Sequence, residues 1–364
     1  MSKIATKVLG LLTTKASSQN AFKRLLSTQP SKLVYSEYGD PIKVIQRANE
    51  DISDPKDGEV LIKMLAAPVN PADINTIQGK YPSKPPLPAV PGNEGVGKVE
   101  KVGGGVTDIC VGDHVVPLTN NLGTWRTHLL LKKENVLKVP QKLGLVEAAT
   151  LTVNPCTAFR MLRDFTSLKP GDTVMQNGAN SACGQNVIQI CRSWGIRTVN
   201  IVRERPNLDE LKAFLTGLGA TYILTEEELR TTNLFKSGEV DRPKLALNCV
   251  GGKNALECTR HLAPGAPMVT YGGMSREPLT VPTSALIFKD IQFRGFWMTR
   301  WSKDNANSVD RLEMFEELIS LMTNNELQGP SHKMVNFDNY KEALMNTMTV
   351  QGMIGKKYIL DFHS

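Results

Sequence analysis

The sequence contains no long hydrophobic run and no cluster of cysteine or histidine residues. No apolar stretch approaches the roughly 20 residues of a membrane-spanning helix, so we expect no membrane span. The six cysteines are scattered along the chain, without the two-residue spacing of a zinc knuckle or a redox motif. The five histidines are equally dispersed. We therefore expect no metal site and a core that contains reduced thiols.

Acidic residues are absent before Glu37, whereas residues 1–30 are rich in serine, threonine and lysine. This composition is typical of a mitochondrial transit peptide, which we expect over residues 1–30, with cleavage near residues 26–28 and delivery to the matrix. The alternative is an ordinary disordered terminus. Without the five cations of this segment the formal net charge falls from +7 to +2, so we expect no nucleic-acid partner. Those cations are Lys3, Lys7, Lys15, Lys23 and Arg24.

The chain of 364 residues is long enough for two domains at about 150 residues each. Residues 31–150 contain short β-forming runs separated by glycine and proline, which predict an irregular β domain. Five prolines within residues 81–91 exclude a helix there and favour an extended loop.

Strands and helices alternate over residues 151–299, which predicts an α/β domain with a parallel sheet covered on both faces. Apolar spacing indicates helices over residues 183–194 and 208–218, the second ending at Gly219. Strands are expected at residues 173–176, 198–202, 245–249, 267–270 and 291–298. We expect a helix over residues 309–324 and a strand over 357–360, and we expect residues 300–364 to return to the first domain and complete it.

Residues 177–184 form a turn between a predicted strand and a predicted helix, where a dinucleotide fold binds phosphate. Gly178 and Gly184 match the glycine fingerprint, but Ser181 and Ala182 stand where a third glycine is expected. A tight turn without any nucleotide explains this segment equally well.

Arg203 and Arg205 directly follow the next predicted strand, at 19 and 21 residues beyond Gly184. Cations at this place bind the 2′-phosphate of NADP, whereas an NAD enzyme has an acid there. A solvated charged loop is the alternative. Gly272 and Gly273 follow a later strand and would let a nicotinamide ribose approach the backbone, although a simple turn has the same sequence.

Three segments resemble the medium-chain dehydrogenase/reductase superfamily: the Asn70-Pro71-x-Asp73 turn, the Gly-x-Glu-Gly-x-Gly turn at residues 92–97, and residues 111–115. Zinc alcohol dehydrogenases of that superfamily have a metal-ligand histidine where this chain has Asn93, and they carry a four-cysteine lobe that is absent here. Zinc-assisted alcohol oxidation is therefore not expected.

Within the zinc-free branch, residues 31–364 resemble the mitochondrial 2-enoyl thioester reductases, which implies a GroES-like domain and a Rossmann domain that binds NADPH. The likeness lies in residues 78–81, 122–127, 153–158, 203–205, 271–274 and 295–297. It implies that Tyr81 is the catalytic residue and that seventeen further positions bind NADPH. The last of these positions is Lys357, and the adjacent Lys356 would take its place if the match to the family shifted by one residue. Those positions are Asn154, Asn180, Ser181, Ala182, Cys183, Arg203, Glu204, Arg205, Tyr271, Gly272, Gly273, Met274, Phe296, Trp297, Met298, Thr299 and Lys357.

The implied reaction is the reduction of a trans-2-enoyl thioester of coenzyme A or acyl carrier protein to the saturated thioester. Hydride from NADPH would reach C3, and Tyr81 would complete the addition as an acid, because a phenol with a pKa of about 10 stays protonated at neutral pH. The alternative for Tyr81 is packing within its proline-rich loop. Alternatives for the whole chain are a zinc-free quinone oxidoreductase and a nucleotide-binding regulator without turnover. The resemblance also implies a homodimer joined through residues 291–298.

Overall fold

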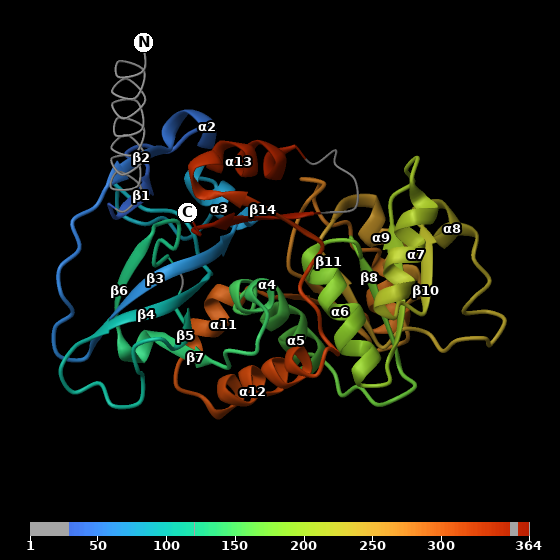
Figure 1. The fold of residues 1–364 in the computed structure, drawn as a ribbon. Coiled ribbons are helices and arrows are strands. Elements are labelled where there is room, and N and C mark those ends of the chain that lie inside the picture. The colour runs from blue at the N-terminus through green and yellow to red at the C-terminus, as the bar shows by residue number, and fades with distance from the viewer. Residues whose placement is uncertain (1–28, 120, 350–355, 364) are drawn as a thin grey trace, which may run out of the picture.

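The computed structural model describes residues 29–119, 121–349 and 356–363. The expected transit peptide and its cleavage point lie almost wholly outside these residues. Within them, the strands form a two-stranded hairpin, a seven-stranded sheet with antiparallel and parallel pairs, here called the mixed sheet, and a six-stranded parallel sheet (Figure 1). No helix in this part of the chain is long and apolar enough to cross a membrane.

The mixed sheet has the strand order β14-β15-β3-β4-β5-β7, with β6 paired to β3. Apolar side chains such as Ile62 and Trp125 are fully buried in its core. The short strands of residues 31–150 agree with the β pattern of the sequence. The hairpin is β1 (Ser31–Val34) and β2 (Gln46–Asn49), and the mixed sheet comprises β3 (Glu59–Pro68), β4 (Val96–Val102), β5 (His114–Pro117), β6 (His128–Lys132), β7 (Val136–Val139), β14 (His332–Asn336) and β15 (Lys357–Asp361). Helices α2 (Pro41–Val44), α3 (Pro71–Ile77) and α13 (Tyr340–Met348) accompany it.

The parallel sheet has the order β10-β9-β8-β11-β12-β13, and every neighbouring pair is parallel. Successive residues of β8 point to opposite faces of the sheet and enter different cores. Val174 packs with α5, α6 and α12, and Met175 packs with α8, α9 and α10. Helices therefore cover both faces, which confirms the doubly wound α/β prediction. The strands are β8 (Thr173–Asn177), β9 (Arg197–Val202), β10 (Tyr222–Thr225), β11 (Leu245–Asn248), β12 (Pro267–Thr270) and β13 (Gln292–Gly295).

Local sequence signals explain where the helices of this unit begin and end. Ser181 caps α6, and its hydroxyl accepts a hydrogen bond from the Gly184 N–H at 3.0 Å. Gly219 ends α7 with a φ of 104°, a left-handed conformation that suits glycine. The helices are α4 (Leu145–Ala149), α5 (Asn154–Asp164), α6 (Ala182–Ser193), α7 (Leu208–Leu218), α8 (Glu226–Thr231), α9 (Gly252–His261), α10 (Thr283–Lys289), α11 (Met298–Asp304) and α12 (Val309–Thr323).

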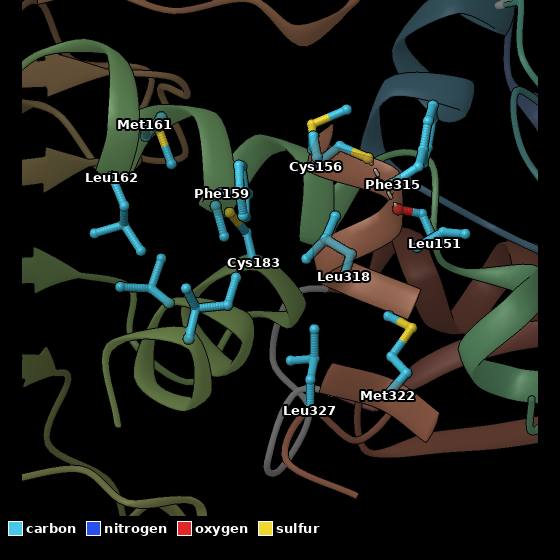
Figure 2. Packing of buried hydrophobic residues seen from close by; sticks show 14 of the residues in the cluster. Leu151, Cys156, Phe159, Met161, Leu162, Cys183, Phe315, Leu318, Met322 and Leu327 are labelled. Atoms are coloured by element: carbon cyan, nitrogen blue, oxygen red, sulfur yellow. Dashed lines mark hydrogen bonds between the residues drawn. The ribbon is translucent and has the colours of Figure 1, made fainter. Parts of the chain in front are cut away.

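The end of the chain returns to the mixed sheet. Strand β15 pairs with β3 and β14. On the way, α12 packs on α5, and Figure 2 shows side chains of both helices together with Cys183 of α6 in one apolar cluster. This shared core holds the two units against each other.

The prediction of a buried strand over residues 291–298 is wrong in the length of the strand and in its burial. Strand β13 covers only Gln292–Gly295, and α11 begins at Met298. It is the last strand of the parallel sheet, and Gln292, Arg294 and Gly295 are exposed. The apolar run looked buried because Phe296 and Trp297, which follow the strand, pack against other parts of the molecule.

Candidate active site

The residues expected to bind NADPH follow four strands of the parallel sheet. Arg203 follows β9, the turn at Asn180 follows β8, Tyr271 follows β12 and Phe296 follows β13. Parallel strands end at one edge of a sheet, so these segments lie side by side there in the order of the strands. Four inter-strand spacings separate β9 from β13, which amounts to a distance of about 19 Å. An extended ligand can therefore contact all of them.

The turn after β8 leaves no room for side chains at two glycines. A Cβ on Gly178 would lie 2.5 Å from Cys249 Sγ, and Gly178 has a φ of 59°. A Cβ on Gly184 would lie 2.5 Å from the carbonyl oxygen of Ala179, where α6 meets the turn. The close approach brings the first N–H groups of α6 to the sheet edge, so the turn fits a pyrophosphate although its third glycine is missing.

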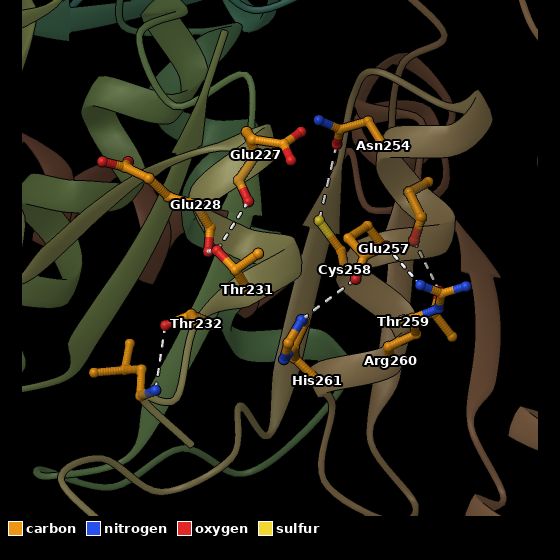
Figure 3. Close-up of polar contacts among 12 residues, drawn as sticks. Glu227, Glu228, Thr231, Thr232, Asn254, Glu257, Cys258, Thr259, Arg260 and His261 are labelled. Atoms are coloured by element: carbon orange, nitrogen blue, oxygen red, sulfur yellow. Dashed lines mark hydrogen bonds and ion pairs between the residues drawn. The ribbon is translucent and has the colours of Figure 1, made fainter. Parts of the chain in front are cut away.

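A row of amide side chains connects the strand ends at this edge. Asn177 Nδ2 donates to Asn248 Oδ1 and to Asn254 Oδ1, each at 2.7 Å, and Asn248 Nδ2 donates to Thr270 Oγ1 at 3.0 Å. Figure 3 shows Asn254 on α9, where its Oδ1 also accepts a hydrogen bond from the Cys258 thiol. Sequence analysis included Asn177 in the expected phosphate-binding turn but gave no role to Asn248 or Asn254. Their only signal was a polar residue at the end of each buried strand, and the row fixes the spacing of the turns that follow.

The two arginines after β9 lie close together without a carboxylate partner within 4.0 Å in the described residues. Arg205 Nε donates to the Arg203 carbonyl oxygen at 3.3 Å. Burial lowers the pKa of Arg205, and the charge of Arg203 lowers it further. Two mutually repelling guanidinium groups at this place are stabilised by a doubly charged anion. Glu204, between them, is exposed.

The segment after β12 lies against the end of β11. The Met274 N–H donates to the Cys249 carbonyl oxygen at 2.9 Å, and a Cβ on Gly272 would lie 3.2 Å from Cys249 Cβ. The Tyr271 hydroxyl is enclosed beside Cys183 and Cys249, and burial raises the pKa of all three groups, to about 12 for Cys183 and about 11 for Cys249. These groups are neutral, so this part of the site carries no charge.

Tyr81 meets the end of β13 from the other unit. Trp297 Nε1 donates to the phenolic oxygen of Tyr81 at 2.8 Å, and the two rings pack edge to face with centroids 5.9 Å apart. Burial raises the pKa of Tyr81, while hydrogen bonds from Trp297 and Thr299 oppose the rise. An indole nitrogen can only donate, so the phenolic proton stays available for a second partner. The structure thus brings Tyr81, Trp297 and Thr299 together.

Lys357 and Asn154 are joined through Asn70 in a largely buried polar network. Lys357 Nζ donates to Asn70 Oδ1, and Asn154 Nδ2 lies 3.5 Å from the same oxygen. Lys357 is 7% exposed, whereas the adjacent Lys356 is exposed. The structure therefore places Lys357, and not its neighbour, in the network.

Two carboxyl groups share this network. Asn70 Nδ2 donates to Glu94 Oε1 at 2.8 Å, and Asn93 Nδ2 donates to Asp73 Oδ1 at 2.6 Å. Burial raises the pKa of Asp73 to about 6 and that of Glu94 to about 7, and the charge of Lys357 counteracts both shifts. Burial lowers the pKa of Lys357, and Glu94 and Asp73 oppose that change. The turns that contain these residues stood out in the sequence, but their meeting with Lys357 did not.

The described residues contain no group of three or more histidine, cysteine or acidic side chains that would hold a metal ion. Asn93, at the position of a zinc ligand in the zinc alcohol dehydrogenases, instead donates to Asp73 and accepts from the Asn121 N–H. The chemistry open to the site is hydride transfer from a nucleotide on the parallel sheet, with a proton from Tyr81.

Comparison with known proteins agrees with both units of the fold. The alcohol dehydrogenase GroES-like domain family matches residues 56–141, and the zinc-binding dehydrogenase family matches residues 182–316. Solved structures with similar folds include the Candida tropicalis mitochondrial 2-enoyl thioester reductase Etr1p/Etr2p heterodimer (34% identity, TM-score 0.85) and a complex of Etr1p with NADP and crotonyl-CoA (33%, 0.84). A putative NADPH:quinone reductase from Bacillus thuringiensis is 26% identical with a TM-score of 0.80. Each alignment covers 92% of this chain and 99% of the other.

Curated relatives are more similar in sequence. The mitochondrial enoyl-acyl-carrier-protein reductase of Rattus norvegicus is 49% identical over 323 residues, which cover 87% of this chain and 85% of the relative. The Homo sapiens protein of the same name is 46% identical over 340 residues, which cover 92% of this chain and 90% of the relative. The chain therefore belongs to the family of mitochondrial enoyl-acyl-carrier-protein reductases.

Proposed function

We propose that this protein uses NADPH to reduce trans-2-enoyl thioesters of coenzyme A or acyl carrier protein to saturated acyl thioesters. The observation that carries the proposal is the contact of Tyr81 with Trp297, which brings a proton donor from the loop between α3 and β4 to the strand end where a nicotinamide ring would lie. The family relatives act on enoyl-acyl carrier protein by name, and the Etr1p complex holds NADP and crotonyl-CoA.

NADPH, when bound, supplies the hydride for C3 of the substrate. As negative charge develops on the thioester oxygen, Tyr81 donates a hydrogen bond to it or a proton toward C2. The phenol suits this role because burial raises its pKa, so it is protonated at neutral pH. Trp297 orients the phenolic oxygen by donating to it, and the phenolic proton is left for the substrate.

The residues proposed to hold NADPH divide by their place on the sheet edge. Arg203 and Arg205 bind the 2′-phosphate, with Glu204 exposed between them. Residues 180–183 bind the pyrophosphate at the start of α6, and residues 271–274 and 296–299 enclose the nicotinamide half. Asn154 and Lys357 complete the pocket from the buried network. The departure of Ala182 and Cys183 from the usual glycine turn changes side chains more than backbone, so it tunes NADPH binding and does not abolish it.

We further propose that residues 31–150 and 300–364 form one catalytic domain and residues 151–299 the NADPH-binding domain. The pairing of β15 with β3 supports this division. The protein is mitochondrial, as its relatives are by name. The matrix and a cleaved leader over residues 1–30 remain predictions from the sequence.

We also propose a homodimer that is joined edge to edge through β13. This strand has a neighbour on one side only within the described part of the parallel sheet. Beside it, α10 exposes three consecutive apolar side chains, with Leu286, Ile287 and Phe288 at 49%, 67% and 80% exposure. A second copy would pair with the edge and cover this patch. The Etr1p/Etr2p assembly is a heterodimer, and this chain would pair with itself.

The proposed reaction is tested with purified protein, crotonyl-CoA and either NADPH or NADH. We expect NADPH oxidation that depends on the enoyl thioester, formation of butyryl-CoA, and much weaker activity with NADH. A simple quinone serves as the competing substrate. Turnover of the quinone but not of any enoyl thioester would assign a quinone reductase, and NADPH binding without turnover of either would assign a regulator.

A further inference from the structure

Glu94 is completely buried and uses both carboxyl oxygens on donors from different parts of the chain. Its Oε1 accepts from Asn70 Nδ2 at 2.8 Å, and its Oε2 accepts from the Val153 N–H at 3.0 Å. With no exposed surface, the carboxylate does not itself touch a bound substrate or cofactor. Any effect on the reaction must act through its partners.

The first partner, Asn70, connects two of the residues proposed to bind NADPH. Its side-chain oxygen accepts from Lys357 Nζ and faces Asn154 Nδ2 at 3.5 Å. An amide has an acceptor end and a donor end, and the ionised carboxylate of Glu94 can only accept. Glu94 therefore decides which end of Asn70 faces Lys357 and Asn154.

The second partner, Val153, is the residue that precedes α5, and Asn154 is the first residue of that helix. The Val153 N–H therefore ties the start of α5 to the turn at residues 92–97. Glu94 is also the largest attractive charge on buried Lys357, ahead of Asp73. One carboxylate thus fixes the position of Asn154 and balances the charge of Lys357.

We propose that Glu94 is a positioning residue that orients Asn70 and, through it and the start of α5, presents Lys357 and Asn154 to the nicotinamide half of NADPH. The inference deepens the proposed function and rests on it. Glu94 acts before any substrate arrives, because its contacts are complete in the protein alone. Its loss is expected to affect NADPH affinity first.

The decisive variant is Glu94→Gln, which keeps the size of the side chain. A glutamine amide cannot satisfy both donors: its NH2 group must face either the Val153 N–H or the site of Asn70. If Asn70 turns to accommodate it, the Asn70 NH2 group faces the Lys357 ammonium. We expect Kd and KM for NADPH to rise at least about tenfold in the full-length protein, with a smaller change in kcat. NADPH fluorescence titration gives Kd without turnover.

The reciprocal pair Asn70→Asp with Glu94→Gln restores complementarity. The new carboxylate would accept from the glutamine amide and from Lys357, and the glutamine oxygen would accept from the Val153 N–H. We expect this double variant to recover most of the NADPH affinity, and Asn70→Asp alone to be worse because two carboxyl groups would meet. Glu50→Gln is the matched control: Glu50 is another partly buried carboxylate with two side-chain partners, Lys32 and Arg126, and neither partner belongs to the proposed NADPH site. Its NADPH affinity should stay that of the wild type.

Wild-type NADPH affinity in folded Glu94→Gln overturns the proposal, as does a double variant with no recovery beyond its two single variants. If Glu94→Gln does not fold, as judged by circular dichroism, the double variant decides alone. Near wild-type affinity then supports the proposal, and an affinity as weak as that of Asn70→Ala overturns it. A wild-type protein that binds NADPH but reduces no enoyl thioester would refute the proposed function and leave this binding test intact.

Discussion

The phenolic oxygen of Tyr81 lies 2.8 Å from the indole nitrogen of Trp297, a residue 216 positions further along the chain. The contact joins the proline-rich loop of one unit to the end of β13 in the other. A tyrosine in an exposed loop would move freely. Here the phenol is held at the mouth of the proposed nicotinamide pocket, and this placement leads to the first two predictions.

Tyr81→Phe removes the only group that we propose to donate a proton to the substrate. We expect kcat for crotonyl-CoA to fall by about 10²- to 10⁴-fold, the usual contribution of a general acid. NADPH Kd should change little, because the ring remains. Tyr38→Phe is the matched control, since the Tyr38 hydroxyl donates to the Pro85 carbonyl oxygen in the same loop and not to a residue of the proposed site. Native-like turnover of Tyr81→Phe at saturating substrate would contradict the catalytic role.

Trp297→Phe keeps an aromatic ring against Tyr81 but deletes the N–H donor. One hydrogen bond of this kind is worth about 0.5–1.5 kcal/mol, so we expect kcat to fall by up to about tenfold. The pH at which the phenol ionises should rise, because the bond to Trp297 lowers the pKa of Tyr81. The alkaline limb of the kcat profile measures it. An unchanged limb would show that Trp297 does not act on the phenol.

Arg203→Ala with Arg205→Ala removes both cations proposed to bind the 2′-phosphate. A charge-assisted hydrogen bond contributes about 1.5–3 kcal/mol, so we expect each arginine to change KM for NADPH by about 10- to 100-fold. Kinetics with NADH should hardly change, since NADH lacks this phosphate. Arg230→Ala on α8 is the control, because that arginine pairs with exposed Glu227. Equal losses of affinity for NADPH and NADH would show that the arginines do not act on the 2′-phosphate.

Gly184→Ala forces a Cβ to within 2.5 Å of the Ala179 carbonyl oxygen. The start of α6 must then move away from the turn. We expect a loss of about 1–3 kcal/mol in the free energy of unfolding and weaker NADPH binding. Gly217→Ala in α7 has open space around its Cβ and should instead stabilise the protein by about 0.5–1 kcal/mol. Urea unfolding of the two variants compares them, and equal effects would contradict the packing argument.

The raised pKa values of Asp73 and Glu94 make stability fall as pH rises. The pKa of Glu94 is about 7 in the folded protein against an ordinary 4.5, and that of Asp73 is about 6 against 3.8. Between these values the folded state holds more protons than the unfolded state. Their favourable contribution is therefore complete below the unfolded pKa and is lost as pH rises through the folded pKa.

Glu94→Gln removes the contribution of Glu94 to this dependence. We expect its free energy of unfolding to fall less steeply than that of the wild type from pH 4.5 to about 7. Chemical denaturation across this interval measures both slopes. Parallel slopes would mean that Glu94 is ionised throughout in the folded protein.

Features that depend on neighbours in sequence were predictable. The stop of α7 at Gly219 and the turn before α6 follow from local conformational preference and the spacing of apolar residues. The contact of Asn70 with Lys357 joins residues 287 positions apart, and no local pattern encodes it. The length of β13 was misjudged for a related reason. Phe296 is apolar because it packs on Phe165, and not because it belongs to a buried strand.

Strand β15 supplies both a neighbour of β3 and the ammonium group of the buried network. Strand β3 precedes the parallel sheet in the chain and β15 follows it, so the mixed sheet cannot close until the whole parallel sheet has been threaded between its two partners. Deletion of residues 357–361 would therefore remove a strand and a buried cation in one step, while every strand of the parallel sheet stays in the chain.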